Sequence, residues 1–164
     1  MKKIGILMGS VSDFPIVEKA IVTLQELEIP YEVHVYSAHR TPEEARQFAL
    51  KARENGFGAI IAAAGMAAHL AGAIAANTTL PVVGIPCKSA SLDGMDALLS
   101  TVMMPPGIPV AAVGINGAVN AALLCAQILA VSDETLAQKL AAKRKKDAEK
   151  VLTADREVAE KYNL

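Results

Sequence analysis

The chain has 164 residues and a mass of 17.1 kDa, and 52% of its residues are hydrophobic while 20% are charged. This balance excludes an intrinsically disordered chain, and a compact fold of this length buries roughly 70% of its unfolded surface. Sixteen basic and seventeen acidic residues give a net charge of -1, so nothing in the overall charge favours a nucleic acid or an anionic membrane as partner.

Two long stretches without charged residues, 55–87 and 97–132, raise the question of a membrane span. Glycine, proline and polar residues interrupt both, so their apolar runs are too short to cross a bilayer as one helix. The opening residues KKIGILMG carry too short an apolar run for an export signal. We therefore expect a cytoplasmic protein with no membrane-spanning segment.

Short apolar runs alternate with helical patterns along the chain. We expect strands over 4–8, 31–36, 59–63, 80–85 and 110–115. The clearest helical stripes between them are Val17, Ala20, Ile21, Leu24 and Leu27, and then Ala45, Phe48, Ala49 and Ala52. Buried strands joined by helices predict an α/β fold, a three-layer doubly wound parallel sheet with helices on both faces.

Capping signals mark the start of the first two helices. Asp13, followed by Pro15, is expected to cap the first helix. Thr41, Pro42 and Glu44 form the pattern of a capping box with proline at the first helical position. Strand, turn and capped helix are therefore the expected repeating unit.

A charged helix is expected after the last strand and helix. Asp133 and Glu134 open it, and the basic tetrad 143–146 lies in its later turns, an order that suits the helix dipole. Asp147 and Glu149 stand beside the tetrad, which favours a solvated helix face over nucleic-acid contact. The expected docking side of this helix consists of Leu136, Leu140, Ala141 and Ala148.

The whole chain, 1–164, is expected to be one domain. Its core would span about 3–131, and a projecting helix and tail about 132–164. A chain this apolar, with a helix projecting from its end, favours association of several copies, so we expect a homo-oligomer.

Polar side chains follow the first two expected strands. Ser10, Ser12 and Asp13 come after the first, where hydroxyls near a helix N-terminus suit a phosphate and a carboxylate suits ribose hydroxyls. An ordinary capped turn explains the same residues. His39 and Arg40 come after the second, and they offer an imidazole for proton transfer and a guanidinium for a phosphate. A surface or capping histidine is the alternative there.

The sequence contains no metal-ligand or cofactor pattern. Cys87 and Cys125 are isolated and have no zinc-ligand spacing to any histidine, so we expect buried free thiols and no bound metal. The glycine pattern of dinucleotide sites and the lysine pattern of ATP sites are both absent. Ala64 to His69 is a run of small residues that would let a ligand approach the backbone, although tight helix packing explains the same composition and is the favoured interpretation at this point.

Six segments occur together in the sequence: MGSVSD at 8–13, SAHRTP at 37–42, AGMAAHLAG at 64–72, LPVVGIP at 80–86, MPPGIPV at 104–110 and NAALLCAQIL at 120–129. In this order they resemble the PurE family, the N5-carboxyaminoimidazole ribonucleotide mutases of purine biosynthesis. The resemblance covers about residues 3–150, and the combination of MGSxSD with SAHR is its most specific part. It implies a flavodoxin-like fold assembled as an octamer, with active sites between subunits.

The resemblance also implies an isomerase that uses no cofactor. N5-carboxyaminoimidazole ribonucleotide would lose its carbamate as carbon dioxide while His39, the catalytic acid and base, protonates the departing nitrogen. The carbon dioxide would then add to C4 of the imidazole, and His39 would remove the C4 proton to give 4-carboxy-5-aminoimidazole ribonucleotide. The implied substrate-binding residues are Ser10, Ser12, Asp13, Ser37, Arg40, Ala64, Gly65, Met66, His69, Lys88 and Ser89.

Alternatives to a mutase remain open at this point. A sister class carboxylates aminoimidazole ribonucleotide directly, but it usually has lysine after the SAH histidine and lacks the AAHL segment, so Arg40 and 67–70 favour the mutases. A noncatalytic nucleotide-binding module could use the same sheet, since a fold does not fix function. A third alternative is a PurE-like carboxylase domain of nickel-pincer cofactor synthesis. Such a domain is normally preceded by a further segment, whereas this chain begins at its first expected strand, which disfavours this alternative.

The resemblance leaves two details open. Members of the family commonly have glycine, proline and glutamine where this chain has Met66, Ala71 and Met103, so the wall of the site is expected to differ in detail. The second open detail is whether the protein makes a transient contact with the synthetase that forms the carbamate.

Overall fold

The structure, a computed structural model, describes residues 1–163 and contains a central sheet of five parallel strands. Its strands are β1 (Lys3–Met8), β2 (Tyr31–Val35), β3 (Phe57–Gly65), β4 (Val82–Cys87) and β5 (Ala111–Ala112). They lie in the order β2-β1-β3-β4-β5, and each neighbouring pair is parallel. This is the strand order of flavodoxin-like sheets, and it confirms the predicted doubly wound α/β fold.

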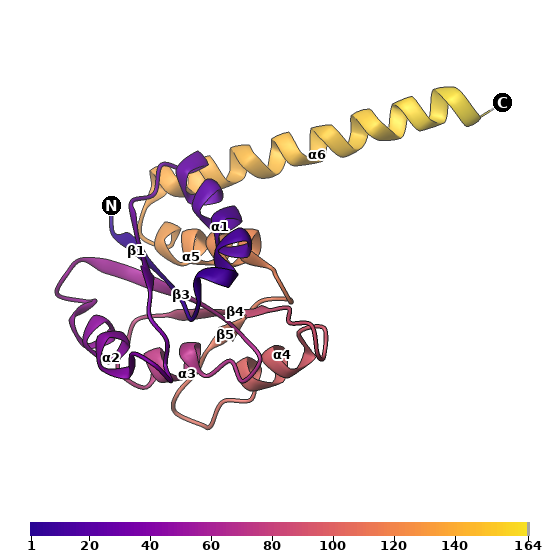
Figure 1. The fold of residues 1–164 in the computed structure, drawn as a ribbon. Helices are drawn as coiled ribbons and strands as arrows, with labels where there is room; N and C mark the ends of the chain where they lie inside the picture. Colours follow the sequence, from indigo (N-terminus) through magenta and orange to yellow (C-terminus); the bar gives the residue numbers. More distant parts are fainter. Residues whose placement is uncertain (164) are drawn as a thin grey trace.

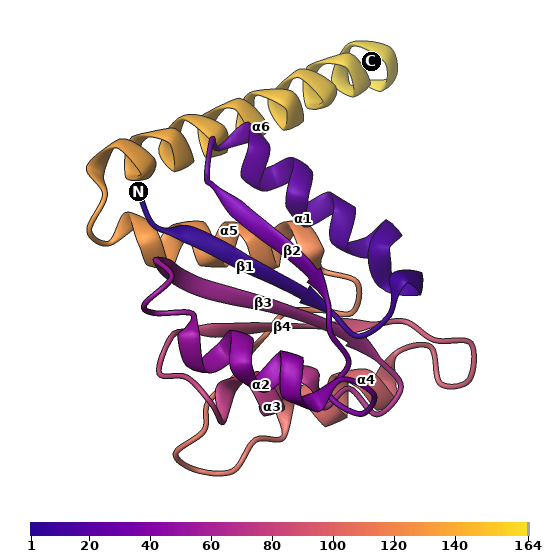
Figure 2. The same cartoon turned by 60° about the vertical axis from the view of Figure 1, so that its left-hand side comes forward.

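Helices cover both faces of the sheet and form the outer two of three layers (Figures 1 and 2). A short 3-10 turn, η1 (Val11–Asp13), leads into α1 (Phe14–Glu26), which shares one face with α5 (Ala118–Ala130). The opposite face is covered by α2 (Pro42–Lys51), α3 (Leu70–Ala75) and α4 (Met95–Val102). The long α6 (Glu134–Tyr162) follows α5.

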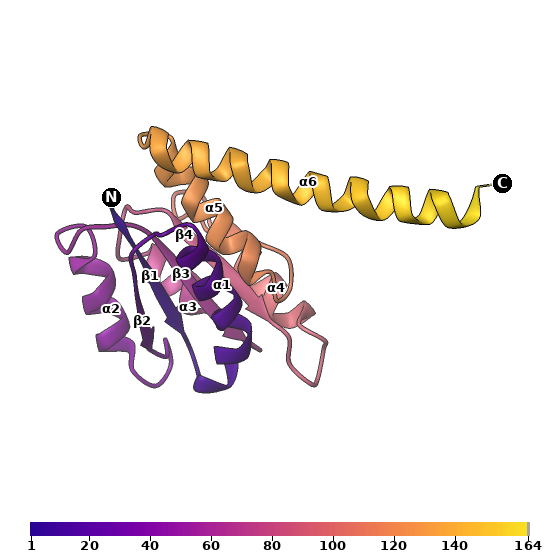
Figure 3. The same cartoon turned by 90° about the horizontal axis from the view of Figure 1, so that it is seen from above.

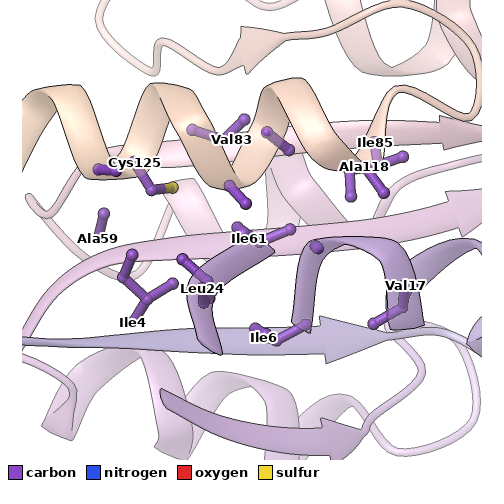
Figure 4. Packing of buried hydrophobic residues seen from close by; sticks show 14 of the residues in the cluster. Ile4, Ile6, Val17, Leu24, Ala59, Ile61, Val83, Ile85, Ala118 and Cys125 are labelled. Carbon is purple, nitrogen blue, oxygen red and sulfur yellow. The ribbon is translucent and has the colours of Figure 1, made fainter. Parts of the chain in front are cut away.

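Burial on both faces explains why β1, β3 and β4 read as apolar runs rather than as alternating patterns, whereas the edge strand β2 has no fully buried residue. Ile6 and Leu7 are both fully buried, yet as neighbours in β1 they face opposite layers and belong to different core clusters. On the first side, Ile6 and Ile61 of the sheet lie in one cluster with Leu24 of α1 and Cys125 of α5 (Figure 4). The expectation of buried free thiols is confirmed for Cys125 and for Cys87.

The fifth strand is much shorter than the predicted 110–115, so that prediction was wrong. Only Ala111 and Ala112 pair with β4. Pro109 precedes them and has no N–H to donate to a ladder. After them only single hydrogen bonds to β4 remain, from Val113 N to Gly84 O at 3.2 Å and from Asn116 N to Pro86 O at 2.9 Å, and the chain turns at Asn116, whose φ of 58° lies in the left-handed region.

The caps predicted for the first two helices are correct in position, with proline in the first turn of each helix, but wrong in their hydrogen bonds. Asp13 and Thr41 do precede α1 and α2, but neither side chain makes a capping hydrogen bond, and no capping box forms with Glu44. Instead, the Thr41 hydroxyl accepts a hydrogen bond from Ser37 N at 2.8 Å and donates to Ser37 O at 3.3 Å. Asp13 lies beside the buried Cys87. A hydrogen bond within its own loop thus engages Thr41, and the contact with Cys87 engages Asp13, so neither side chain caps its helix.

Helix α6 runs out from the compact part of the molecule (Figure 3). It begins at Asp133 and Glu134 as predicted, and the Asp133 side chain caps it by accepting a hydrogen bond from Leu136 N at 3.0 Å. Leu136 is fully buried and Leu140 partly buried, but Ala141 and Ala148 are exposed, so the predicted docking side ends after the first turns. None of the helices within residues 1–163 is long and apolar enough to cross a membrane.

Candidate functional site

A cavity of about 650 Å³ opens where β1, β2, β3 and β4 end, the edge at which parallel sheets collect ligand-binding loops. Every residue proposed from the sequence lines it: Ser10, Ser12, Asp13, Ser37, His39, Arg40, Ala64, Gly65, Met66, His69, Lys88 and Ser89. The lining also includes residues that were not proposed: Gly9, Ile16, Ala38, Ala67 and Leu70. All five are small or apolar, and only Ala67 lies in the run 64–69 that the sequence pointed out.

The loop after β1 carries hydroxyl groups and a half-buried carboxylate. Ser12 Oγ donates to Ser10 Oγ at 2.9 Å, and Ser12 N donates to the same oxygen at 3.3 Å. Burial raises the pKa of the Asp13 carboxyl above its ordinary value, and hydrogen bonds with the Ser10 backbone and the Cys87 thiol oppose this. Burial, and then the Asp13 charge, raises the pKa of Cys87 to about 12, so this thiol stays protonated and is no nucleophile.

The loop after β2 is held in shape by its own serine. Ser37 Oγ accepts hydrogen bonds from His39 N at 3.3 Å and from Arg40 N at 3.2 Å. The Arg40 guanidinium reaches across to the first loop, where it donates to Gly9 O at 3.2 Å. The backbone bonds therefore fix the positions from which the imidazole and the guanidinium enter the cavity.

The two histidines of the cavity are in direct contact. His39 Nε2 lies 2.8 Å from His69 Nδ1, and the rings meet edge to face with their centroids 5.0 Å apart. One of these nitrogens must carry the proton and the other must accept it. His69 was expected in the site, but no local pattern predicts its pairing with His39, because 30 residues separate the two.

The backbone conformation at Met66 suits the glycine that is common at this position in the family. Its φ of 54° lies in the left-handed region that favours glycine, and the Met66 side chain is 65% exposed where the cavity opens. Ala71 occupies the first turn of α3, where a proline can also be accommodated. Met103 follows α4 and is not part of the cavity lining.

The segment after β4 supplies the last proposed residues. Lys88 Nζ lies 3.0 Å from an Asp93 carboxylate oxygen in an exposed ion pair, while Lys88 N donates to Asn116 Oδ1 at 2.8 Å. Ser89 Oγ donates to Asp96 Oδ2 at 3.5 Å. Asn116 and Asp96 were not singled out from the sequence: Asn116 lies 28 residues from Lys88, and Asp96 lies in the first turn of the helix that follows Ser89.

Comparison with known proteins agrees with this arrangement. The family model described as AIR carboxylase matches residues 3–150. The chain belongs to the AIR carboxylase family. This confirms the resemblance stated from the sequence motifs.

Relatives from several bacteria are similar to this chain in sequence and in structure. It is 54% identical over 151 residues to the N5-carboxyaminoimidazole ribonucleotide mutase of Bacillus subtilis, an alignment that covers 91% of this chain and 93% of the relative. It is 51% identical over 152 residues to the Escherichia coli protein of that name, with 92% and 90% covered. The crystal structure of Treponema denticola PurE covers 98% of each chain with a TM-score of 0.84 and 31% identity.

Proposed function

We propose that this member of the AIR carboxylase family is an N5-carboxyaminoimidazole ribonucleotide mutase of purine biosynthesis. The observation that carries the proposal is the His39–His69 contact in a cavity that also holds Arg40 and several hydroxyl groups. A proton donor, a phosphate partner and ribose-binding groups are thus together in one site. The relatives of about 50% identity that bear this name support the same reaction.

The two polar loops would divide the ribonucleotide between them. Arg40 suits the phosphate, because a guanidinium offers two parallel N–H donors, and the Ser10 and Ser12 hydroxyls lie in the facing loop. Asp13 would accept hydrogen bonds from the ribose hydroxyls, since a carboxylate repels a phosphate but accepts from a neutral hydroxyl. Ser37 would act mainly through the loop, because its oxygen already accepts two backbone N–H groups.

His39 would then carry one proton in both directions. The bond between the carbamate carbon and nitrogen breaks, carbon dioxide leaves, and the nitrogen takes a proton from His39. Carbon dioxide next bonds to C4 of the imidazole, and His39 removes the C4 proton, so the proton count closes without another reactant. His69 Nδ1 is the partner of His39 Nε2 in their contact, so His69 would determine which nitrogen of His39 is protonated.

The wall after β3 would keep the carbon dioxide in place. Ala64, Gly65 and Ala67 line the cavity with small side chains or none, so a small molecule can stay close to the imidazole and away from bulk water. Retention of carbon dioxide is what separates a mutase from an enzyme that takes it from solution.

The decisive experiment follows a label from the carbamate. The protein is incubated with carbamate-labelled N5-carboxyaminoimidazole ribonucleotide, without ATP or added bicarbonate, and label is measured in the 4-carboxy product. Rapid turnover with retained label is expected. Product formed only from aminoimidazole ribonucleotide and high carbon dioxide would replace the mutase by a direct carboxylase, and inactivity in both assays would favour a binding module.

We also propose that the protein is a homo-oligomer, an octamer. The far half of α6 has no partner within residues 1–163, yet it exposes Val151, Leu152, Val158 and Tyr162. An isolated helix with exposed apolar side chains is stabilised by packing against another surface. Light scattering after size exclusion should give eight chain masses, and a monomeric mass at micromolar concentration would overturn the proposal.

The Arg40→Ala variant is expected to raise KM for the ribonucleotide about 10- to 100-fold, because a hydrogen bond to a charged group contributes about 1.5–3 kcal/mol. Steady-state kinetics checks this, together with competitive inhibition by inorganic phosphate, which should weaken in parallel. The control is Arg53→Ala: Arg53 donates to Thr79 Oγ1 at 2.9 Å in a different cavity, away from the proposed site. Equal effects of the two changes would contradict a phosphate role for Arg40.

A further inference from the structure

Ser89 lines the cavity on the segment between β4 and α4, and a carboxylate stands behind it. Asp96 lies in the first turn of α4, and its Oδ2 accepts a hydrogen bond from the Ser89 hydroxyl at 3.5 Å. Figure 2 shows how this segment loops out from the end of β4 before α4 begins. Asp96 itself is not part of the cavity lining, so any influence on a ligand must pass through Ser89.

The second carboxylate oxygen of Asp96 is unusual. Among residues 1–163, Asp96 Oδ1 is buried and has no hydrogen-bond partner. An unsatisfied buried oxygen is unfavourable, and most such groups in folded proteins find a partner. Ser100 Oγ does not supply one, because it donates to the Asp96 main-chain oxygen at 2.8 Å. Stabilisation of the fold alone is therefore a poor explanation for a carboxylate at this position.

We propose that Asp96 is a positioning residue that orients the Ser89 hydroxyl, so that Ser89 presents lone pairs to the cavity and forms a subsite for hydrogen-bond donors of the ligand. An ionised carboxylate only accepts, so it fixes the direction of the serine proton. The serine oxygen then has only acceptor capacity left for a ligand.

This orientation decides which part of a ribonucleotide can lie at Ser89. The dianionic phosphate of a ribonucleotide has only acceptor oxygens, so it has no proton to donate to a serine hydroxyl that already donates to Asp96. Ribose hydroxyls and the exocyclic amino group of aminoimidazole ribonucleotide do carry donors. The inference rests on the proposed ribonucleotide site, and it assigns Ser89 to the ribose or base portion while Arg40 serves the phosphate.

A structural role for Asp96 has to be separated from this one. A carboxylate in the first turn of a helix also stabilises that helix through the dipole, and Asp96 has this place in α4. Glu134 has the equivalent place in α6, away from the cavity, so Glu134→Gln measures loss of such a charge alone. Asp96→Asn removes the charge but keeps an oxygen that can accept the serine proton.

The test is calorimetric binding of aminoimidazole ribonucleotide, which needs no turnover, with inorganic phosphate as second probe. Ser89→Ala and Asp96→Ala should each weaken ribonucleotide binding about 3- to 10-fold, and the double variant no further, because both remove one interaction. Phosphate binding should stay within twofold, as should ribonucleotide binding by Asp96→Asn and Glu134→Gln.

Three results would overturn the inference. The first is unchanged ribonucleotide binding by Ser89→Ala, which is decisive even if Asp96→Ala does not fold. The second is equal loss of phosphate and ribonucleotide binding, and the third is full additivity in the double variant. Absence of ribonucleotide binding by the unmodified protein would instead overturn the proposed function, so the two failures are distinguishable.

Discussion

Replacing His39 with asparagine should lower kcat by about 10²- to 10⁴-fold, the usual contribution of a general acid and base. Asparagine retains hydrogen-bonding capacity beside His69 but cannot give and take a proton in the neutral range. Binding of aminoimidazole ribonucleotide should therefore change less than about threefold. Steady-state kinetics and calorimetry on the same preparations separate the two effects.

A matched control for His39→Asn is available in β2. His34→Asn likewise removes an imidazole ring, but His34 lies outside the cavity and stacks on Tyr36 with the ring centroids 4.9 Å apart. Its kcat should stay within about twofold of the unmodified protein. If His39→Asn also keeps full turnover, His39 is not the acid and base, and a catalytic role has to be sought elsewhere in the cavity.

The position of His39 beside His69 leads to a distinct expectation for the second ring. His69→Asn should lower kcat less than His39→Asn and should change the pH dependence of kcat, because the contact sets which nitrogen of His39 holds the proton. A measured pH profile distinguishes this from a loss of packing, which would lower kcat evenly at every pH. An unchanged profile would mean that His69 only lines the cavity.

Truncation of Leu24 to alanine should destabilise the fold by about 2–5 kcal/mol, the range for a leucine whose removal leaves a cavity in a packed core. Leu24 is fully buried between α1 and the sheet, in the cluster that contains Ile4 and Ile61 (Figure 4). Urea denaturation followed by circular dichroism, at one fixed protein concentration, measures the difference. A fixed concentration matters because association of subunits would add to the apparent stability.

The control for Leu24→Ala is the same substitution in another helix. Leu50 of α2 is 45% exposed, so Leu50→Ala should cost less than about 1 kcal/mol. Similar losses of stability from Leu24→Ala and Leu50→Ala would have one of two explanations. Either another subunit covers Leu50 in solution, or the α1 face of the sheet is less tightly packed than the structure indicates. Unfolding at two protein concentrations distinguishes these explanations, because only the first depends on association.

The alternation of apolar strands and amphipathic helices was sufficient to predict the α/β fold. Ile4 to Met8 and Ala59 to Ala63 could be identified as buried strands because their composition and length are local properties of the chain. The same holds for the cap of α6, where Asp133 bonds to a residue only three positions away. The motifs around Asp13 and His39 likewise located the site, since each loop carries its own chemical groups.

Contacts between distant segments could not be predicted from the sequence. A local pattern can also mislead: Thr41 has the sequence of a helix cap, but its hydroxyl bonds to Ser37, four residues earlier, because the loop that carries His39 folds back on itself. The His39–His69 contact joins two segments 30 residues apart, and the Ser89–Asp96 contact joins a loop to the first turn of the helix that follows it; no local pattern encodes either contact. Composition and periodicity thus determined the elements and the candidate residues, whereas the parallel sheet decided which side chains meet, because it brings the ends of β1 to β4 to one edge.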